Sequence, residues 1–217
     1  MAASQVNATR MELTRQKKKL VTAEKGHRLL KDKRDELMRQ FMDLVRENME
    51  LRKKVEKGIQ NANRNFVLAK AGMSEEALRT ALMTPKQEVY LKSGKKNVMS
   101  VDIPVFDYTT RTSDQNDIYS YGYAFTSSDL DGAVYSLSEV FPDMLRLAEV
   151  EKSCQLMASE IEKTRRRVNA LEHVIIPETR DNIRYISNKL DENERSTQVR
   201  LMKVKDMVLQ DAHHYQE

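Results

Sequence analysis

The stretch HRLLKDKRDELMRQFMDLVRENMELRKKVEKG, residues 27–58, decides the fold of this chain. Leucines recur in it every seven residues, at Leu30, Leu37, Leu44 and Leu51. A second apolar set interleaves with these leucines at alternating steps of three and four residues: Leu13, Leu20, Phe41 and Val55. Such a repeat keeps one face of a supercoiled helix apolar. The spacing therefore predicts one helix of a coiled coil.

Three positions on this apolar seam carry polar residues, namely His27, Arg34 and Asn48. Polar groups at seam positions cost stability, but they fix the register and the choice of partner helix. No proline occurs between Thr9 and Lys70. We therefore predict an uninterrupted helix over this range, about 90 Å long at the usual rise per residue.

The last third of the chain repeats the pattern. The same three-four alternation runs through Leu147, Val150, Cys154, Met157, Ile161, Val168, Leu171 and Ile175. Next to Pro177 the pattern slips by one residue, and it then continues through Ile176, Ile183, Ile186 and Leu190. It slips a second time before Leu201, Val204 and Val208. Because a proline inside a helix removes a backbone hydrogen bond, we expect a local bend at Pro177. We expect the two helices to match in length and to pair antiparallel, with both termini at one end.

The pattern changes between the two helices. Ser74 is a candidate N-cap for a short helix that ends at Met83, before Pro85. QEVYLKSGKKNVMSVDIPVFDY, residues 87–108, then alternates as a β-hairpin does, with Ser93-Gly94 at the predicted turn. The polar, tyrosine-rich residues that follow predict a loop.

These patterns predict an all-α dominated fold: a long antiparallel two-helix coiled coil with a small β-hairpin and loop cap at its far end. We divide the chain into a first long helix (residues 1–72), a cap (73–128) and a second long helix (129–217). Composition agrees, since 32% of residues are charged and only 6% aromatic, which is typical of long helices and not of a compact core.

Charge is distributed unevenly along the chain. Residues 1–34 hold ten Lys/Arg and three Asp/Glu, a net +7, whereas residues 100–145 hold one Arg and eight Asp/Glu, a net −7. This polarity predicts two ends with different neighbours. One cysteine, no secretory signal and no apolar run of membrane-spanning length predict a cytoplasmic protein that does not insert into the membrane.

No arrangement of residues predicts catalysis or a cofactor. Ser93-Gly94-Lys95-Lys96 lacks the upstream glycine and the following Ser/Thr of a phosphate-binding loop. Cys154 lies on the apolar seam, where a buried thiol is far commoner than a nucleophile. His213-His214 fits a frayed tail better than a metal site. We expect no metal, and no nucleic acid, because the basic residues are interleaved with a sustained seam.

Two blocks of the sequence resemble the D subunits of the V-type and archaeal-type rotary ATPases. They are TRMELTRQKKKLVTAEKGHRLLKDKRDELMRQF, from Thr9, and EIEKTRRRVNALEHVIIPETRDNIRYISNKLDENER, from Glu160. GHRLLKDKRDEL and RRVNALE are the most specific parts of the two blocks. The chain departs from the family at Ala8, where Pro is common, and at Thr179 and Asn182, where Leu and Thr are common.

The resemblance implies a central rotor shaft, seated in a hexamer of catalytic (A) and nucleotide-binding (B) subunits. It also implies a small F subunit on the side of the shaft and a membrane-ring adaptor at its far end. The candidates for contact with the head are basic residues near the N-terminus: Arg10, Arg15, Lys17, Lys18 and Lys19. Lys95 and Lys96 are candidates for contact between the hairpin and a partner.

A prefoldin-like holdase chaperone is the alternative, since two coiled-coil helices flank β-hairpin material there too. Prefoldin tips expose apolar residues to their clients. We expect the terminal end of this chain to be basic and to lack an apolar patch, which favours the rotor.

Overall fold

The computed structural model describes residues 6–112, 114, 117–122 and 126–214, with side chains as far as Leu209. Two compact units make up the chain. Unit 1 combines Met1–Arg34 with Lys163–Glu217, and unit 2 is Asp35–Glu162. Long helices with a small two-stranded hairpin confirm the predicted fold class.

Unit 1 is an antiparallel helix pair. Its first helix is the beginning of α1 (Arg10–Gly72), and its second comprises the end of α3 (Ser128–Ala170) followed by α4 (Ile176–His214). Arg10 forms an ion pair with Glu194, and Arg180 Nη2 lies 2.7 Å from Glu24 Oε1. A residue later in α1 thus pairs with a residue earlier in α4, so the two helices run in opposite directions.

The seam of unit 1 is apolar with several polar insertions. Val168 and Ile186 are buried, and the half-buried seam residues are Leu30, Leu171, Ile175 and Ile183. Gln16, Thr164 and Thr179 are also buried on this seam. Thr179 Oγ1 donates a hydrogen bond to the Ile175 carbonyl at 2.6 Å, so its hydroxyl is satisfied within its own helix.

A π-helical turn, η1 (Leu171–Ile175), joins α3 to α4. The Ile176 amide donates to the Leu171 carbonyl, five residues back, where an α-helix would bond four residues back. Such a turn accommodates one extra residue. It therefore explains why the apolar pattern slips by one residue next to Pro177.

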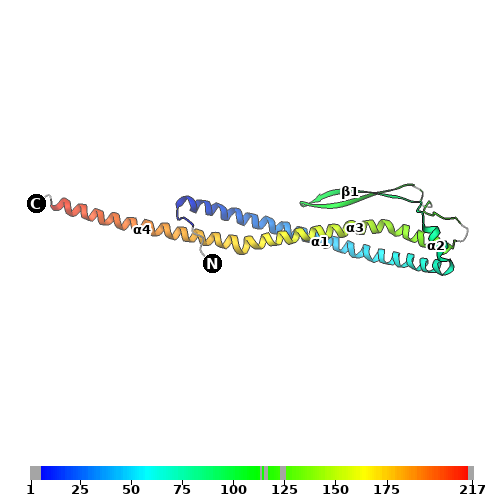
Figure 1. Ribbon diagram of the computed structural model, residues 1–217. Helices are drawn as coiled ribbons and strands as arrows, with labels where there is room; N and C mark the ends of the chain where they lie inside the picture. The colour runs from blue at the N-terminus through cyan, green and yellow to red at the C-terminus, as the bar shows by residue number, and fades with distance from the viewer. Residues whose placement is uncertain (1–5, 113, 115–116, 123–125, 215–217) are drawn as a thin grey trace. The chain divides into compact units, whose positions relative to one another are not determined.

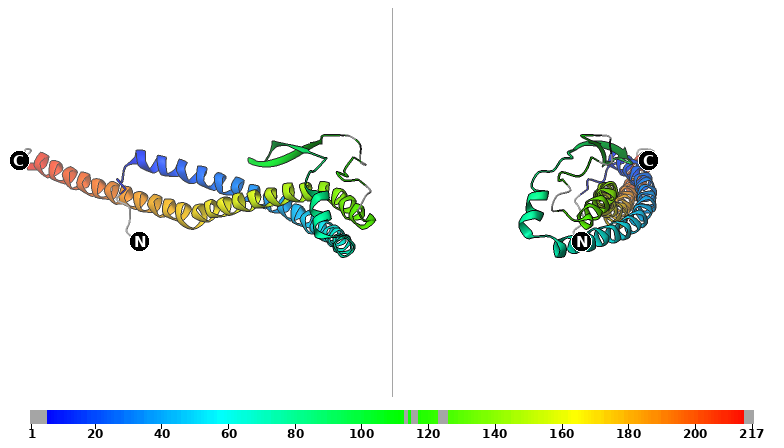
Figure 2. Two further views of the ribbon diagram at one scale, coloured as in Figure 1. Left: turned by 45° about the vertical axis from the view of Figure 1, so that its right-hand side comes forward. Right: turned by 90° about the vertical axis from the view of Figure 1, so that its right-hand side faces the viewer.

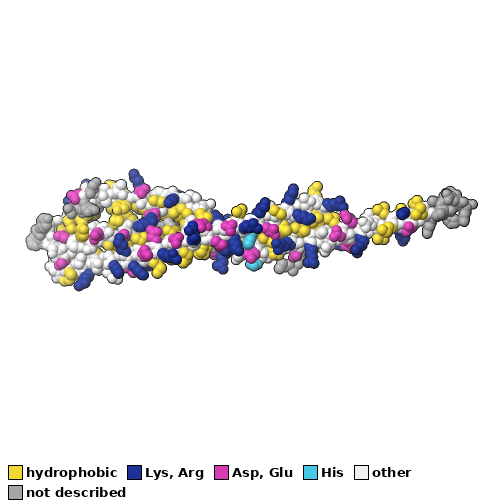
Figure 3. All heavy atoms as spheres, turned by 180° about the vertical axis from the view of Figure 1, so that it is seen from behind, with side chains coloured by type: hydrophobic (Ala, Val, Ile, Leu, Met, Phe, Trp, Pro, Cys, Tyr) yellow, Lys and Arg dark blue, Asp and Glu magenta, His cyan; other side chains and the backbone are white. Residues whose placement is uncertain are grey.

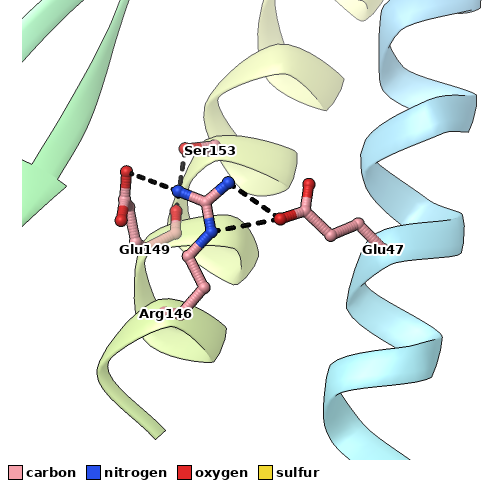
Figure 4. Close-up of polar contacts among 4 residues, drawn as sticks. All are labelled: Glu47, Arg146, Glu149 and Ser153. Carbon is pink, nitrogen blue, oxygen red and sulfur yellow. Dashed lines mark hydrogen bonds and ion pairs between the residues drawn. The ribbon is translucent and has the colours of Figure 1, made fainter. Parts of the chain in front are cut away.

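In unit 2, α1 and α3 also run antiparallel. Lys54 Nζ lies 2.8 Å from Asp143 Oδ2, and Arg146 Nη2 donates to Glu47 Oε1 at 2.8 Å (Figure 4). Arg146 Nη1 also reaches Glu149 on its own helix at 3.1 Å. The hydrogen bonds to Glu47 raise the pKa of Arg146 above its ordinary value. These partly exposed pairs contribute little energy, but they show the register in which the two helices pair.

Small residues bring the two helices of unit 2 close together. A Cβ added at Gly58 would lie 2.2 Å from Val140 Cγ2, so no larger residue fits there without movement. Ala62 and Ala69 are buried one and two heptads beyond Val55. Farther along the same helix pair, Leu37, Met157 and Ile161 belong to an apolar cluster, and Leu44 packs against it; Leu51 is half-buried.

The short helix α2 (Glu75–Leu82) begins as predicted. The Ser74 hydroxyl accepts a hydrogen bond from the Ala77 amide at 3.3 Å, which is an N-cap. Leu78 and Ala81 of α2 are buried against Ala69 and Leu130, and so close this end of unit 2.

The hairpin consists of β1 (Val89–Val98) and β2 (Val101–Thr110). Its turn is Met99-Ser100, with φ of 51° and 70°, so the prediction of a turn at Ser93-Gly94 was wrong. Two consecutive positive φ values are typical of the type I′ turn of tight hairpins. The Asn97 side chain supports the turn by accepting a hydrogen bond from the Ser100 amide at 3.2 Å.

Apolar packing explains where the turn lies. Val101 is buried against Leu37 and Met157, and Val98 and Met99 pack on the same cluster. At the other end of the hairpin, the rings of Tyr108 and Phe141 meet edge to face. The hairpin thus lies back along α3 instead of forming a cap beyond the helix ends (Figures 1 and 2).

Candidate functional site

Among the described residues of unit 1, the end of α4 has no partner helix. Glu194 pairs with the first residue of α1, and α4 continues beyond this point (Figure 1). Every residue from 195 to 209 is exposed. The prediction that Leu201, Val204 and Val208 continue the packed seam was therefore wrong. The two helices also differ in length, because the second runs from Ser128 to His214 through the π turn whereas α1 ends at Gly72.

This end, which we call the α4 tip (residues 199–209), is rich in exposed apolar side chains (Figure 3). Seven of them are 50–64% exposed: Val199, Leu201, Met202, Val204, Met207, Val208 and Leu209. Successive residues of an α-helix are turned by about 100°, so these seven point in directions all around the helix. A helix that is apolar on all sides is normally enclosed.

The expectation that the terminal end lacks an apolar patch was therefore wrong. The sequence does carry a signal, since seven of the eleven residues in 199–209 are apolar. Heptad spacing does not reveal it, because the apolar residues here follow no single face of the helix.

The basic candidates at the start of α1 are all exposed. Arg10 pairs with Glu194, and Arg15 lies 3.7 Å from Glu12 on its own helix. Among the described side chains, no ion pair involves Lys17, Lys18 or Lys19. Unit 1 as a whole holds 21 Lys/Arg and 12 Asp/Glu, a net +9, whereas unit 2 holds 16 and 21, a net −5. The charge asymmetry thus follows the two units.

Lys95 and Lys96 lie within strand β1, not in a turn. In the register of the hairpin, Lys95 is opposite Pro104 and Lys96 is opposite Ile103, so neither lysine faces a carboxylate across the strands. Both remain exposed. The hairpin therefore presents cationic side chains on the surface of an otherwise acidic unit.

Cys154 is half-buried on α3. Burial raises the pKa of its thiol above the ordinary value, and the nearby Glu47 and Glu151 carboxylates add to the effect. The thiol therefore stays protonated at neutral pH, which does not favour a nucleophile. No group of three His, Cys, Asp or Glu residues that could hold a metal occurs among the described residues. The side chains of His213-His214 lie outside the described part of the chain.

Comparison with known proteins gives the family. The family model for the D subunit of ATP synthase matches residues 12–206. The V-type ATP synthase D subunit of Acetivibrio thermocellus is 59% identical over 217 residues, covering 100% of this chain and 98% of that protein. The corresponding subunit of Clostridioides difficile is 57% identical over 98% of this chain and 95% of its own length. This chain belongs to the family of ATP synthase D subunits.

Family membership decides against the prefoldin-like alternative. It also makes the chain a subunit of an ATP synthase complex, so other subunits are its partners. In the part of the chain that the structure describes, no helix has the length and hydropathy to cross a membrane. The α4 tip, the basic start of α1 and the β1 surface all expose side chains that are suited to contact with such partners.

Proposed function

We propose that this chain is the central rotor shaft of a V/A-type rotary ATPase. It is a non-catalytic subunit that transmits torque between the ATP-hydrolysing or ATP-synthesising head and the membrane ion-translocating ring. Its partners are the catalytic A and nucleotide-binding B subunits, the small F subunit of the stalk and the membrane-ring adaptor. It acts in the cytoplasm, peripheral to the membrane. Family membership and the α4 tip together support this role.

The α4 tip is the observation that favours a shaft seated in a surrounding head. A partner that docks on one side of a helix needs apolar residues on one face only. The tip exposes apolar side chains around its whole circumference, which suits a socket formed by several subunits. Apolar contact is non-directional, so it holds the tip in place at every angle of rotation.

The basic residues of α1 complement the apolar tip. Arg10, Arg15 and Lys17–Lys19 are exposed, so any ion pairs that they form with a partner stay solvated. Each solvated pair is worth about 0–1 kcal/mol and exchanges readily with another. We infer that these charges guide assembly with the head without holding the shaft at one angle.

Replacing apolar residues of the α4 tip tests whether the tip binds in the hexamer of A and B subunits. We expect Leu201→Ser, Val204→Ser and Val208→Ser together to weaken binding to the purified hexamer of A and B subunits about 100-fold. The estimate takes about 1 kcal/mol for the exposed half of each side chain, converted to affinity. Titration calorimetry measures the affinity. The isolated variant should melt like the native chain, because these residues touch no partner helix.

The control for this tip variant is Lys203→Gln with Lys205→Gln, which changes polar residues of the same segment. We expect it to bind the hexamer within a few-fold of the native chain, since solvated charges contribute little. Equal loss in both variants would mean that the tip is not held by apolar contact, and full affinity of the serine variant would contradict the proposed seat.

Removing the basic residues tests the guiding charges. Replacing Arg10, Arg15, Lys17, Lys18 and Lys19 by Gln should weaken assembly with the head and reduce its dependence on salt. The measurement is affinity across a salt series. A control with the same change in net charge replaces five exposed residues of unit 2: Lys53, Lys57, Arg64, Lys70 and Lys152. An identical salt slope for the two variants would show that only net charge matters.

A further inference from the structure

In the part of the chain that the structure describes, no strand pairs with the outer edge of β1. The Arg111 amide donates a hydrogen bond to the Glu88 carbonyl at 2.9 Å, and Val98 is paired with Val101 next to the turn. These two pairs establish which residues of β1 form hydrogen bonds with β2. In an antiparallel pair, the alternate residues point their amides and carbonyls away from the partner strand. On β1 those outward residues are Val89, Leu91, Ser93, Lys95 and Asn97. All five are exposed.

The outer edge of β2 differs from that of β1. Its outward positions include Pro104, opposite Lys95, and proline has no amide hydrogen to donate. The side chains of Ile103, Pro104, Val105 and Phe106 are also half-buried, whereas β1 is exposed from Val89 to Asn97. Of the two edges, only that of β1 offers a continuous and accessible row of donors and acceptors.

The charge of β1 indicates which chemistry the edge accepts. β1 contains three lysines and no acidic residue, within a unit whose net charge is −5. No ion pair involves Lys92, Lys95 or Lys96 among the side chains of residues 6–112, 114, 117–122 and 126–209. Two copies of this edge repel each other, which prevents self-association. A segment carrying carboxylates meets no such repulsion.

The apolar residues among the five outward positions of β1 lie at one end of the edge. Leu91 is opposite Tyr108, and Val89 is two residues away on the same face of the hairpin; the three side chains are 40–50% exposed. A strand added to β1 therefore meets an apolar surface beside Val89 and Leu91 and cationic side chains beside Lys95 and Lys96. Side chains alternate between the two faces of a sheet, so both kinds of contact are available to one extended segment.

We propose that the outer edge of β1 binds an extended, acidic segment of another subunit of the ATPase as a third strand. The segment carries one or two apolar residues beside Val89 and Leu91 and carboxylates beside Lys95 and Lys96. Main-chain hydrogen bonds give this mode of binding its affinity, and the side-chain surfaces give it specificity. The inference rests on the proposed function, because it takes the segment from the same complex.

The test removes one outward amide without touching the bonds inside the hairpin. Ser93→Pro deletes an outward N–H, as Pro104 does on β2, and the matched control Ser93→Ala keeps that N–H. The probe is the set of other soluble subunits, purified without this chain. We expect Ser93→Pro to bind them about fivefold more weakly, as for one lost hydrogen bond, and Ser93→Ala to bind as the native chain does.

Amide exchange of the native chain gives an independent readout. On assembly, the outward amides of Leu91, Ser93 and Lys95 should exchange at least tenfold more slowly. Exchange at an unchanged rate in a chain that has assembled would overturn the third strand and leave the rotor proposal standing. Equal affinity of Ser93→Pro and Ser93→Ala would do the same. Failure of the native chain to assemble with the other subunits would overturn both.

Discussion

Deletion of Val174 should leave the helix pair of unit 1 folded, whereas deletion of Arg165 should destroy it. Both residues are exposed and lie in the same continuous run of helix. The difference that matters for the register is their place in the helix: Val174 belongs to the π turn, and Arg165 precedes it in the α-helix. The comparison therefore tests whether the π turn exists to absorb one surplus residue.

The seam before and after the π turn shows why Val174 is dispensable. Residues facing α1 proceed by steps of three and four along Thr164, Val168, Leu171, Ile176, Thr179, Ile183 and Ile186, except for one step of five. That step, from Leu171 to Ile176, spans the π turn. Without Val174 it becomes a step of four, which an ordinary α-helix accommodates on the same face.

Deletion of Arg165 has the opposite effect. It turns every later residue by about 100° relative to the helix before it. The positions that Val168, Thr179 and Ile186 hold would then pass to Asn169, Arg180 and Ser187. Burying a charged residue in the seam without a partner costs several kcal/mol. This exceeds what a marginal helix pair can lose, so the pairing of α1 with α4 should open.

Amide exchange in residues 10–34 of α1 measures this pairing directly. We expect the Val174 deletion to keep native protection and to unfold in urea within about 1 kcal/mol of the native chain. The Arg165 deletion should lose protection over the same residues. If both deletions unfold unit 1, the π turn has another structural role, and if neither does, the seam does not set the register.

Much of this fold was predictable because heptad spacing reports directly on packing. The leucines at steps of seven predicted α1, and Leu37 is completely buried in a core cluster with Val101, Met157 and Ile161. The slip at Pro177 was also visible in the sequence. The sequence did not show whether a proline kink or a π turn causes this slip, since both shift an apolar pattern by a fraction of a turn.

The turn of the hairpin was mispredicted for a physical reason. Serine and glycine are common turn residues, so local propensity favours a turn at Ser93-Gly94 over one at Met99-Ser100. The burial of Val98, Met99 and Val101 on the helix pair outweighs that preference. A packing contact with residues as distant as Leu37 and Met157 leaves no local signal in the sequence of the turn.

The candidate sites were less predictable than the fold. Exposure of the basic residues follows from their positions between seam leucines, so it could be read from spacing. Whether a helix packs against the α4 tip depends on where α1 begins relative to α4, and the spacing of apolar residues alone does not predict this. The open edge of β1 depends on the hairpin register, and that register follows from a turn that local propensity misplaced.

Gly58→Leu should strongly destabilise unit 2, although glycine is normally the weak point of a helix. A Cβ at this position would lie 2.2 Å from Val140 Cγ2, and the other three Leu side-chain carbons have to be placed as well. Val140 is itself buried and β-branched, so its side chain has few alternative rotamers. Overpacking of this kind costs about 3 kcal/mol or more, which outweighs the roughly 1 kcal/mol of helix propensity that leucine adds.

Gly26→Leu is the matched control, because a Cβ at Gly26 meets no atom within 4 Å. There we expect stabilisation by about 1 kcal/mol, from helix propensity alone. Urea unfolding gives both free energies. A double-mutant cycle with Gly58→Ala and Val140→Ala locates the clash: the alanine pair should be more stable than the sum of the single changes by about 0.5–3 kcal/mol. If Gly58→Leu stabilises the chain as Gly26→Leu does, the helices of unit 2 do not approach closely at Gly58.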